Sequence, residues 1–177
     1  MPSFGGHGSR HLHAIVTSVF HKCVLAHWLR YEAYPGHVVS FMRGGQGAGR
    51  RALLVHLWAK GSIVDYFPRS HLLELAATKG GRLLWETPKD ALSEAGCIPC
   101  EKCFDEGGLV ILDARIKYEI KTGYAITFEL GTEDLVRDWP KMELPKLEVL
   151  ERKVASMQSA EVQLNFTFDP SLVAKPE

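Results

Sequence analysis

The feature that most constrains this chain is the alternation of side chains between residues 114 and 130, in which apolar residues alternate with polar residues or, at position 125, with alanine. The apolar positions are Ala114, Ile116, Tyr118 and Ile120 in a first run, and Tyr124, Ile126, Phe128 and Leu130 in a second. Successive side chains of a strand point to opposite faces, so each run predicts a strand with one buried and one solvated face. Thr122-Gly123 separates the runs, which predicts an antiparallel hairpin in the C-terminal part of the chain.

Other segments predict helices as well as strands. Apolar residues at helical spacing from Leu12 to Ala26 predict an amphipathic helix over residues 11–34, ended by Pro35-Gly36. Ser70 is placed to cap a helix over residues 71–79. Strands are expected over residues 37–42, 63–67 and 162–168, and the apolar run 52–58 fits a strand or a helix. We therefore expect an α+β fold, with an N-terminal amphipathic helix and a mainly antiparallel sheet that ends in a C-terminal hairpin.

Composition narrows the class of protein further. The 177 residues include 21 Lys plus Arg and 21 Asp plus Glu, so the formal charge is zero, and 46% of residues are hydrophobic. The high apolar fraction excludes a disordered chain, and the balanced charge argues against a protein that coats nucleic acid with its whole surface. The length predicts one α+β domain over residues 10–170, between a flexible N-terminus (1–9) and a flexible tail (171–177).

No segment has the pattern of a membrane span or a signal peptide. The longest apolar stretch, residues 14–29, is interrupted by His21, Lys22 and His27. It falls short of the roughly 20 apolar residues that a spanning helix needs. We therefore expect no transmembrane segment and a cytoplasmic location.

Three of the four cysteines, Cys97, Cys100 and Cys103, lie in one short segment. Zinc binds thiolates tetrahedrally at ~2.3 Å, so this C-x-x-C-x-x-C pattern predicts a zinc site with three cysteine ligands and one further ligand. Cys23 and His27 are four residues apart on the expected helix and are a candidate source of that ligand, with simple core packing as the alternative. Dithiol redox chemistry and incidental surface thiols also stay open for the cluster.

The glycine-rich loop of residues 43–51 carries Arg43, Arg50 and Arg51 and no acidic residue. Gly44 and Gly49 have the spacing of a P-loop, in which backbone N–H groups hold phosphate. Arg50 and Arg51 stand where that pattern requires Lys and a Mg²⁺-binding Ser or Thr. The three arginines therefore predict a phosphate or other anion site without the metal, and a plain surface loop is the alternative.

Asp113 with Glu119-Ile120-Lys121 resembles the acidic-x-Lys signature of metal-dependent nucleases. Two carboxylates six residues apart on one strand lie about 20 Å apart, which is too far to share a metal ion. Another carboxylate, such as Asp65, would have to complete the site. A solvated strand face is the simpler interpretation.

The sequence contains no nucleophile elbow and no aromatic-and-basic RNA-binding motif. We therefore expect a non-enzymatic protein that acts through self-association or a protein partner, a small viral structural protein of the matrix type being one version. Local contact with the phosphates of nucleic acid or lipid is compatible with this expectation. The alternative is a zinc-binding regulator or enzyme that combines the cysteine cluster with the arginine loop.

Overall fold

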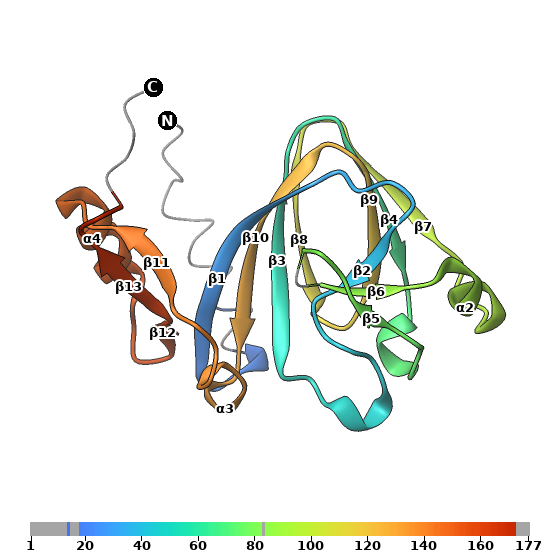
Figure 1. The fold of residues 1–177 in the computed structure, drawn as a ribbon, viewed down its shortest axis with the longest axis horizontal. Helices are drawn as coiled ribbons and strands as arrows, with labels where there is room; N and C mark the ends of the chain where they lie inside the picture. The colour runs from blue at the N-terminus through green and yellow to red at the C-terminus, as the bar shows by residue number, and fades with distance from the viewer. Residues whose placement is uncertain (1–13, 15–17, 83, 173–177) are drawn as a thin grey trace. The chain divides into compact units, whose positions relative to one another are not determined.

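The computed structural model describes residues 14, 18–82 and 84–172, and it contradicts the expected α+β class. The described residues form 13 strands in three sheets and three short α-helices, so the protein is mostly β (Figure 1). Residues 1–9 and 173–177, which include most of the two expected flexible ends, lie outside the described residues.

The elements follow one another along the chain with short connections. The strands are β1 (Cys23–Glu32), β2 (Val38–Ser40), β3 (Ala52–Trp58), β4 (Ser62–Phe67), β5 (Thr78–Lys79), β6 (Trp85–Thr87), β7 (Cys100–Phe104), β8 (Gly108–Asp113), β9 (Lys117–Thr122), β10 (Tyr124–Gly131), β11 (Met142–Pro145), β12 (Val162–Leu164) and β13 (Phe166–Asp169). The helices are α2 (Lys89–Glu94), α3 (Glu133–Val136) and α4 (Glu148–Met157), with 3₁₀ turns at Gln46–Ala48 and Ser70–Leu72.

Three sheets result from this order. One has five strands in the order β12-β1-β10-β3-β8, one has six in the order β5-β6-β2-β9-β4-β7, and β11 pairs with β13. The chain divides into two compact units, a central unit (Trp28–Glu129) and a terminal unit that combines Met1–His27 with Leu130–Glu177. No described helix is long and apolar enough to cross a membrane.

The predicted N-terminal helix over residues 11–34 is wrong from Cys23 to Glu32, whereas the described residues Ala14, Ser18 and Val19 are helical. Cys23–Glu32 is a strand, and most of the residues before it lie outside the described ones. The first four residues of β1 are all buried, so both faces of the strand are covered there. A strand that is buried on both faces reads as a continuous apolar run, which periodicity alone does not separate from a helix.

The predicted C-terminal hairpin is also wrong, although both of its strands exist. β9 lies between β2 and β4 in the six-stranded sheet, whereas β10 lies between β1 and β3 in the five-stranded sheet. Gly123 joins them with φ +78°, and a Cβ there would lie 2.9 Å from Ser62 Cα. The glycine therefore turns the chain from one sheet into the other instead of closing a hairpin.

The predicted helix over residues 71–79 is replaced by a 3₁₀ turn and an extended segment. Ser70 Oγ accepts a hydrogen bond from the Lys117 backbone N–H (2.9 Å) and makes no side-chain helix cap. Leu73 and Leu75 both pack against a buried cluster of Val38, Phe67, Leu92 and Cys97, at the i, i+2 spacing of extended chain. Packing of this segment on the outer side of the six-stranded sheet thus overrides the local helix signal.

Aromatic and polar side chains fill the core of the central unit. The His56 ring of β3 lies edge-on to Tyr118 of β9, with 5.0 Å between ring centroids, so the two larger sheets meet there. Trp58 Nε1 donates a hydrogen bond to the Tyr66 hydroxyl (2.9 Å). The buried hydroxyl of Tyr31 donates to Glu129 Oε1 (3.0 Å).

The terminal unit has its own small core. Val24, Ala26 and Val136 are buried together, and Trp139 packs against them. The His27 ring stacks on Trp139 with 6.1 Å between centroids. β11 and β13 pair in parallel, with Met142 opposite Phe166.

Candidate functional site

The three clustered cysteines do not converge in the structure. Cys97 is buried in the apolar cluster under α2, whereas Cys100 and Cys103 lie on β7. Because their separation of three residues is odd, a strand places Cys100 and Cys103 on opposite faces. Cys23 and His27 lie on a strand, where four residues span about 13 Å. Among the described residues no group of three His, Cys, Asp or Glu could hold a metal ion, so elemental analysis of the purified protein is the test left for the zinc prediction.

Hydrogen bonds to other parts of the chain hold the glycine-rich loop in place. The Gly45 N–H donates to His71 O (3.0 Å), and Gly45 O accepts from Arg115 Nη1 (3.1 Å). A Cβ on Gly44 would lie 2.5 Å from Leu73 O, so close packing explains this glycine. Of the three arginines, Arg50 is exposed and Arg51 is half-buried. The third, Arg43, is exposed and lies over the Trp85 ring.

Three carboxylates form a row across neighbouring strands. Asp65 of β4 stands directly opposite Glu119 of β9 on one side and opposite Glu101 of β7 on the other. Residues opposite each other in an antiparallel pair point to the same face, so all three carboxylates lie on one face of the six-stranded sheet. Asp65 is thus placed where the acidic-x-Lys pattern would need it, and Asp113 lies on β8 in the other sheet.

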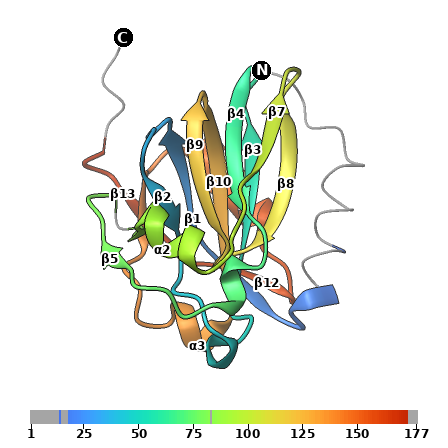
Figure 2. The same cartoon turned by 90° about the vertical axis from the view of Figure 1, so that its right-hand side faces the viewer.

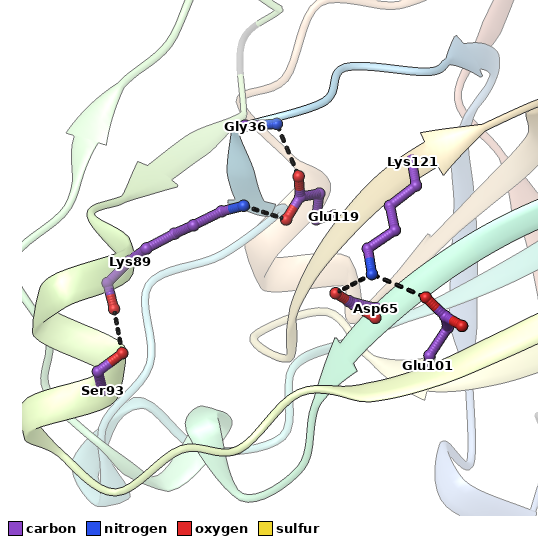
Figure 3. Close-up of polar contacts among 7 residues, drawn as sticks. All are labelled: Gly36, Asp65, Lys89, Ser93, Glu101, Glu119 and Lys121. Atoms are coloured by element: carbon purple, nitrogen blue, oxygen red, sulfur yellow. Dashed lines mark hydrogen bonds and ion pairs between the residues drawn. The ribbon is translucent and has the colours of Figure 1, made fainter.

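Lysines neutralise this carboxylate row (Figure 3). Lys121 Nζ lies 2.7 Å from Asp65 Oδ2 and 2.8 Å from Glu101 Oε2, and these hydrogen bonds raise the pKa of the lysine. Lys89 Nζ lies 2.6 Å from Glu119 Oε2, and the Gly36 N–H donates to Glu119 Oε1 (2.6 Å). Burial would raise the pKa of Glu119, but the hydrogen bonds from Lys89 and Gly36 outweigh it and lower the pKa.

The ion pair with Lys89 and the hydrogen bond from Gly36 give Glu119 a structural role, because they hold neighbouring elements in position. Lys89 is the first residue of α2, and its carbonyl accepts from Ser93 Oγ (3.1 Å). Gly36 belongs to the turn that leads into β2. Glu119 therefore anchors both the start of α2 and the turn before β2 on the same strand. This fixes the side chains that follow in the turn.

Two groups of cations and aromatic rings come from the segments around β2 and β6, and the first of them adjoins Gly36 in the chain. The Tyr34 and His37 rings are parallel within 6°, with 3.7 Å between centroids, and the Arg82 guanidinium lies 4.3 Å from the Tyr34 centroid. The Arg43 guanidinium and Lys79 Nζ lie 4.4 Å and 5.1 Å from the Trp85 centroid. We call these six residues the cation–aromatic surface: Tyr34, His37, Arg43, Lys79, Arg82 and Trp85.

Both groups come from the segments that form or flank β5, β6 and β2, which are neighbours at one end of the six-stranded sheet (Figure 1). Glu86 follows Trp85 on β6, and its Oε2 lies 2.9 Å from His37 Nδ1. Arg82 is held by two backbone carbonyls, with Nη1 donating to Glu32 O (2.7 Å). Arg43 Nη2 donates to Ala77 O (3.0 Å). The guanidinium planes are therefore held in fixed positions, although both side chains are exposed.

A hollow lies at each end of the first stack. Arg82 lines a cavity of about 380 Å³ together with Leu29, Arg30, Tyr31 and Glu32. His37 lines a second cavity, of about 210 Å³, which also receives Lys89 and the buried Thr87. Thr87 Oγ1 has no hydrogen-bond partner among the described residues. His37 and Arg82, the two outer members of the stack, thus line two different concave sites.

Comparison of the sequence with protein-family models and with curated proteins gives no match. Of the site residues predicted from the sequence, the cation–aromatic surface contains Arg43. Its other five members, Tyr34, His37, Lys79, Arg82 and Trp85, were not predicted. They come from two distant segments, so a search for a contiguous motif does not detect them. The pairing of β2 with β6, which brings the segments together, leaves no signal in the spacing of these residues.

Proposed function

We propose that this protein is a binding protein for single-stranded nucleic acid and that the cation–aromatic surface is its binding site. The observations that carry the proposal are the stack of Arg82, Tyr34 and His37 and the cluster of Arg43, Trp85 and Lys79. Proteins that bind single strands combine cations for the phosphates with flat groups on which unpaired bases stack.

The structure contains both the cations and the flat stacking groups, at distances that allow bases to stack. Arg82 and His37 cannot share one face of Tyr34 at 4.3 Å and 3.7 Å, so they cover opposite faces. The outer faces of the guanidinium and the imidazole are then the ends of the stack, and each end lines a hollow. A base that enters a hollow can continue the stack, because guanidinium planes and aromatic rings both accept bases.

Charge supports a phosphate ligand at the same place. Arg43, Lys79 and Arg82 are exposed. The loop that begins at Arg43 carries two more arginines and no acidic residue. The predicted anion residues Arg43, Arg50 and Arg51 therefore belong to this proposal. A lipid headgroup would engage the cations but would leave the stacked rings without a role, and a duplex hides the faces of its bases.

The test is fluorescence anisotropy with a labelled single strand of about 20 nucleotides, titrated between roughly 50 and 200 mM salt. Tyr34→Leu removes the ring that holds Arg82 and His37 in one stack. It should weaken binding about tenfold, the loss expected when a base that contributes roughly 1–3 kcal/mol no longer stacks on either end. Tyr34→Phe keeps the ring and should bind like the wild type. Arg82→Ala should lower the slope of log affinity against log salt by about 1.

Lys102→Ala is the matched control, because Lys102 is an exposed cation of β7 at the opposite edge of the same sheet. It should bind like the wild type. The proposal fails if Lys102→Ala and Arg82→Ala weaken binding equally, or if a duplex of the same sequence binds as tightly as the single strand. Thermal unfolding of each variant checks that the fold is intact.

A further inference from the structure

We propose that β8 is a self-association edge, at which a second copy of this chain adds its own β8 in antiparallel orientation. β8 is the last strand of the five-stranded sheet and pairs with β3 over its whole length, from Gly108 opposite Trp58 to Asp113 opposite Leu53 (Figure 2). Its other edge faces no described strand of that sheet. This inference does not depend on the proposed nucleic-acid ligand.

The backbone groups at the open edge can be assigned from the pairing with β3. Hydrogen-bonded and non-hydrogen-bonded pairs alternate along an antiparallel ladder. The Ala114 N–H donates to Ala52 O (3.1 Å), so positions 112, 110 and 108 also bond toward β3. Leu109 and Ile111 therefore direct their N–H and C=O groups to the open edge.

The open edge of β8 lacks the features that normally prevent strand addition. Proteins protect edge strands with charged residues, proline or very short strands. β5 at one edge of the six-stranded sheet has two residues and includes Lys79, and β7 at the other edge carries Glu101 and Lys102. β8 has six residues, and the stretch from Gly108 to Leu112 contains no charge and no proline.

The residues of β8 are complementary to themselves in one register. The outward-directed groups pair if a two-fold axis passes through Val110, which places Leu109 opposite Ile111 of the second copy. This makes four backbone hydrogen bonds between the copies. Leu109, which is 52% exposed, then packs against an apolar side chain on the same face of the sheet. Two glycines, Gly107 and Gly108, lie opposite Asp113 and Leu112 of the second copy and leave room for them. No like charges face each other, so a second copy fits this edge better than a charged peptide.

The test is sedimentation equilibrium of the full chain over a range of concentrations, up to about 100 μM. The wild type should form dimers. Leu109→Lys and Ile111→Glu should each raise the dissociation constant at least about tenfold, because each puts a charge opposite an apolar side chain. The double variant should recover much of the affinity, since the register places the introduced lysine of one copy opposite the introduced glutamate of the other at both ends of the pair.

Ile98→Lys is the control, because Ile98 is a 79% exposed apolar residue of the same unit that lies outside β8. It should dimerise like the wild type. A wild type that is monomeric throughout the range overturns the proposal. The proposal is also overturned if all three β8 variants dimerise as tightly as the wild type. A double variant whose dimer dissociation constant is no lower than that of either single variant refutes the register. Circular dichroism confirms that each variant is folded.

Discussion

Lys117 supplies the most quantitative prediction. This lysine is 1% exposed and lies on the outer face of β9, beneath the segment that contains α2. Its Nζ donates to Arg115 O (3.0 Å). Burial, with a smaller contribution from the charge of Arg115, lowers the pKa of Lys117 from 10.5 to about 8. The folded protein therefore carries a penalty for keeping this lysine protonated.

The magnitude follows from the difference between the two pKa values. A shift of 10.5 − 8 = 2.5 corresponds to about 3 kcal/mol, at roughly 1.4 kcal/mol for each unit. Because the folded-state pKa lies below the unfolded one, the full penalty applies below pH 8 and disappears as the pH rises from 8 to 10.5. Lys117→Met removes the penalty but leaves Arg115 O without its donor, which costs about 1–2 kcal/mol. We expect the variant to be more stable than the wild type at pH 7 by about 1–2 kcal/mol.

The assay is urea unfolding of both proteins at pH 7 and pH 10. The advantage of Lys117→Met should shrink by about 2–3 kcal/mol between these values, and the comparison cancels the titration of every other group. Lys102→Met, at an exposed position of β7, should show no such change. An advantage that is independent of pH, or a loss of more than about 2 kcal/mol at pH 7, would refute the reasoning.

Two further predictions concern the same unit. Burial lowers the pKa of His56 to about 3. The free energy of unfolding of the wild type should therefore fall by roughly 1.4 kcal/mol for each unit that the pH drops between about 6 and 3. In His56→Leu, whose unfolding is followed by circular dichroism, this slope should be lost. An unchanged acid slope would contradict the assignment. Gly123→Ala should destabilise by more than about 2 kcal/mol in urea unfolding, because it combines φ +78° with a contact on Ser62, whereas Gly47→Ala, where a Cβ meets nothing, should be nearly neutral. Equal losses for the two alanine variants would show that the corner between β9 and β10 is not strained.

The solvated faces expected for the strands of residues 114–130 are wrong, because Lys117, Glu119, Thr127 and Glu129 are all buried. The alternation itself correctly predicts two strands, because the orientation of successive side chains is a local property of the chain. It cannot predict their partners, because pairing is decided by distant segments. Gly123 suits a hairpin turn and a corner between sheets equally well, and only the structure distinguishes them. The apolar run in β1 is ambiguous for a related reason, since burial on both faces removes the alternation.

Less of the candidate site than of the fold could be predicted from the sequence. Glu119-Ile120-Lys121 has a recognisable pattern, but the register that places Asp65 opposite Glu119 is a tertiary fact. The cation–aromatic surface had no local signal apart from Arg43. Its stacks form because β2 and β6 are neighbours, with Val39 opposite Glu86. Residues that act together here are brought together by the sheet order and not by their spacing in the chain.

Photocrosslinking tests the proposed function most directly. A single strand of about 20 nucleotides that contains 5-iodouridine, irradiated with the full-length protein, forms covalent bonds to aromatic rings that stack on its bases. Peptide mapping should place these bonds at His37, whose outer face is one end of the first stack, and at Trp85. Bonds found only at other aromatic residues, such as Phe104 of β7 or Tyr124 of β10, would contradict the account, and so would their absence at saturating protein.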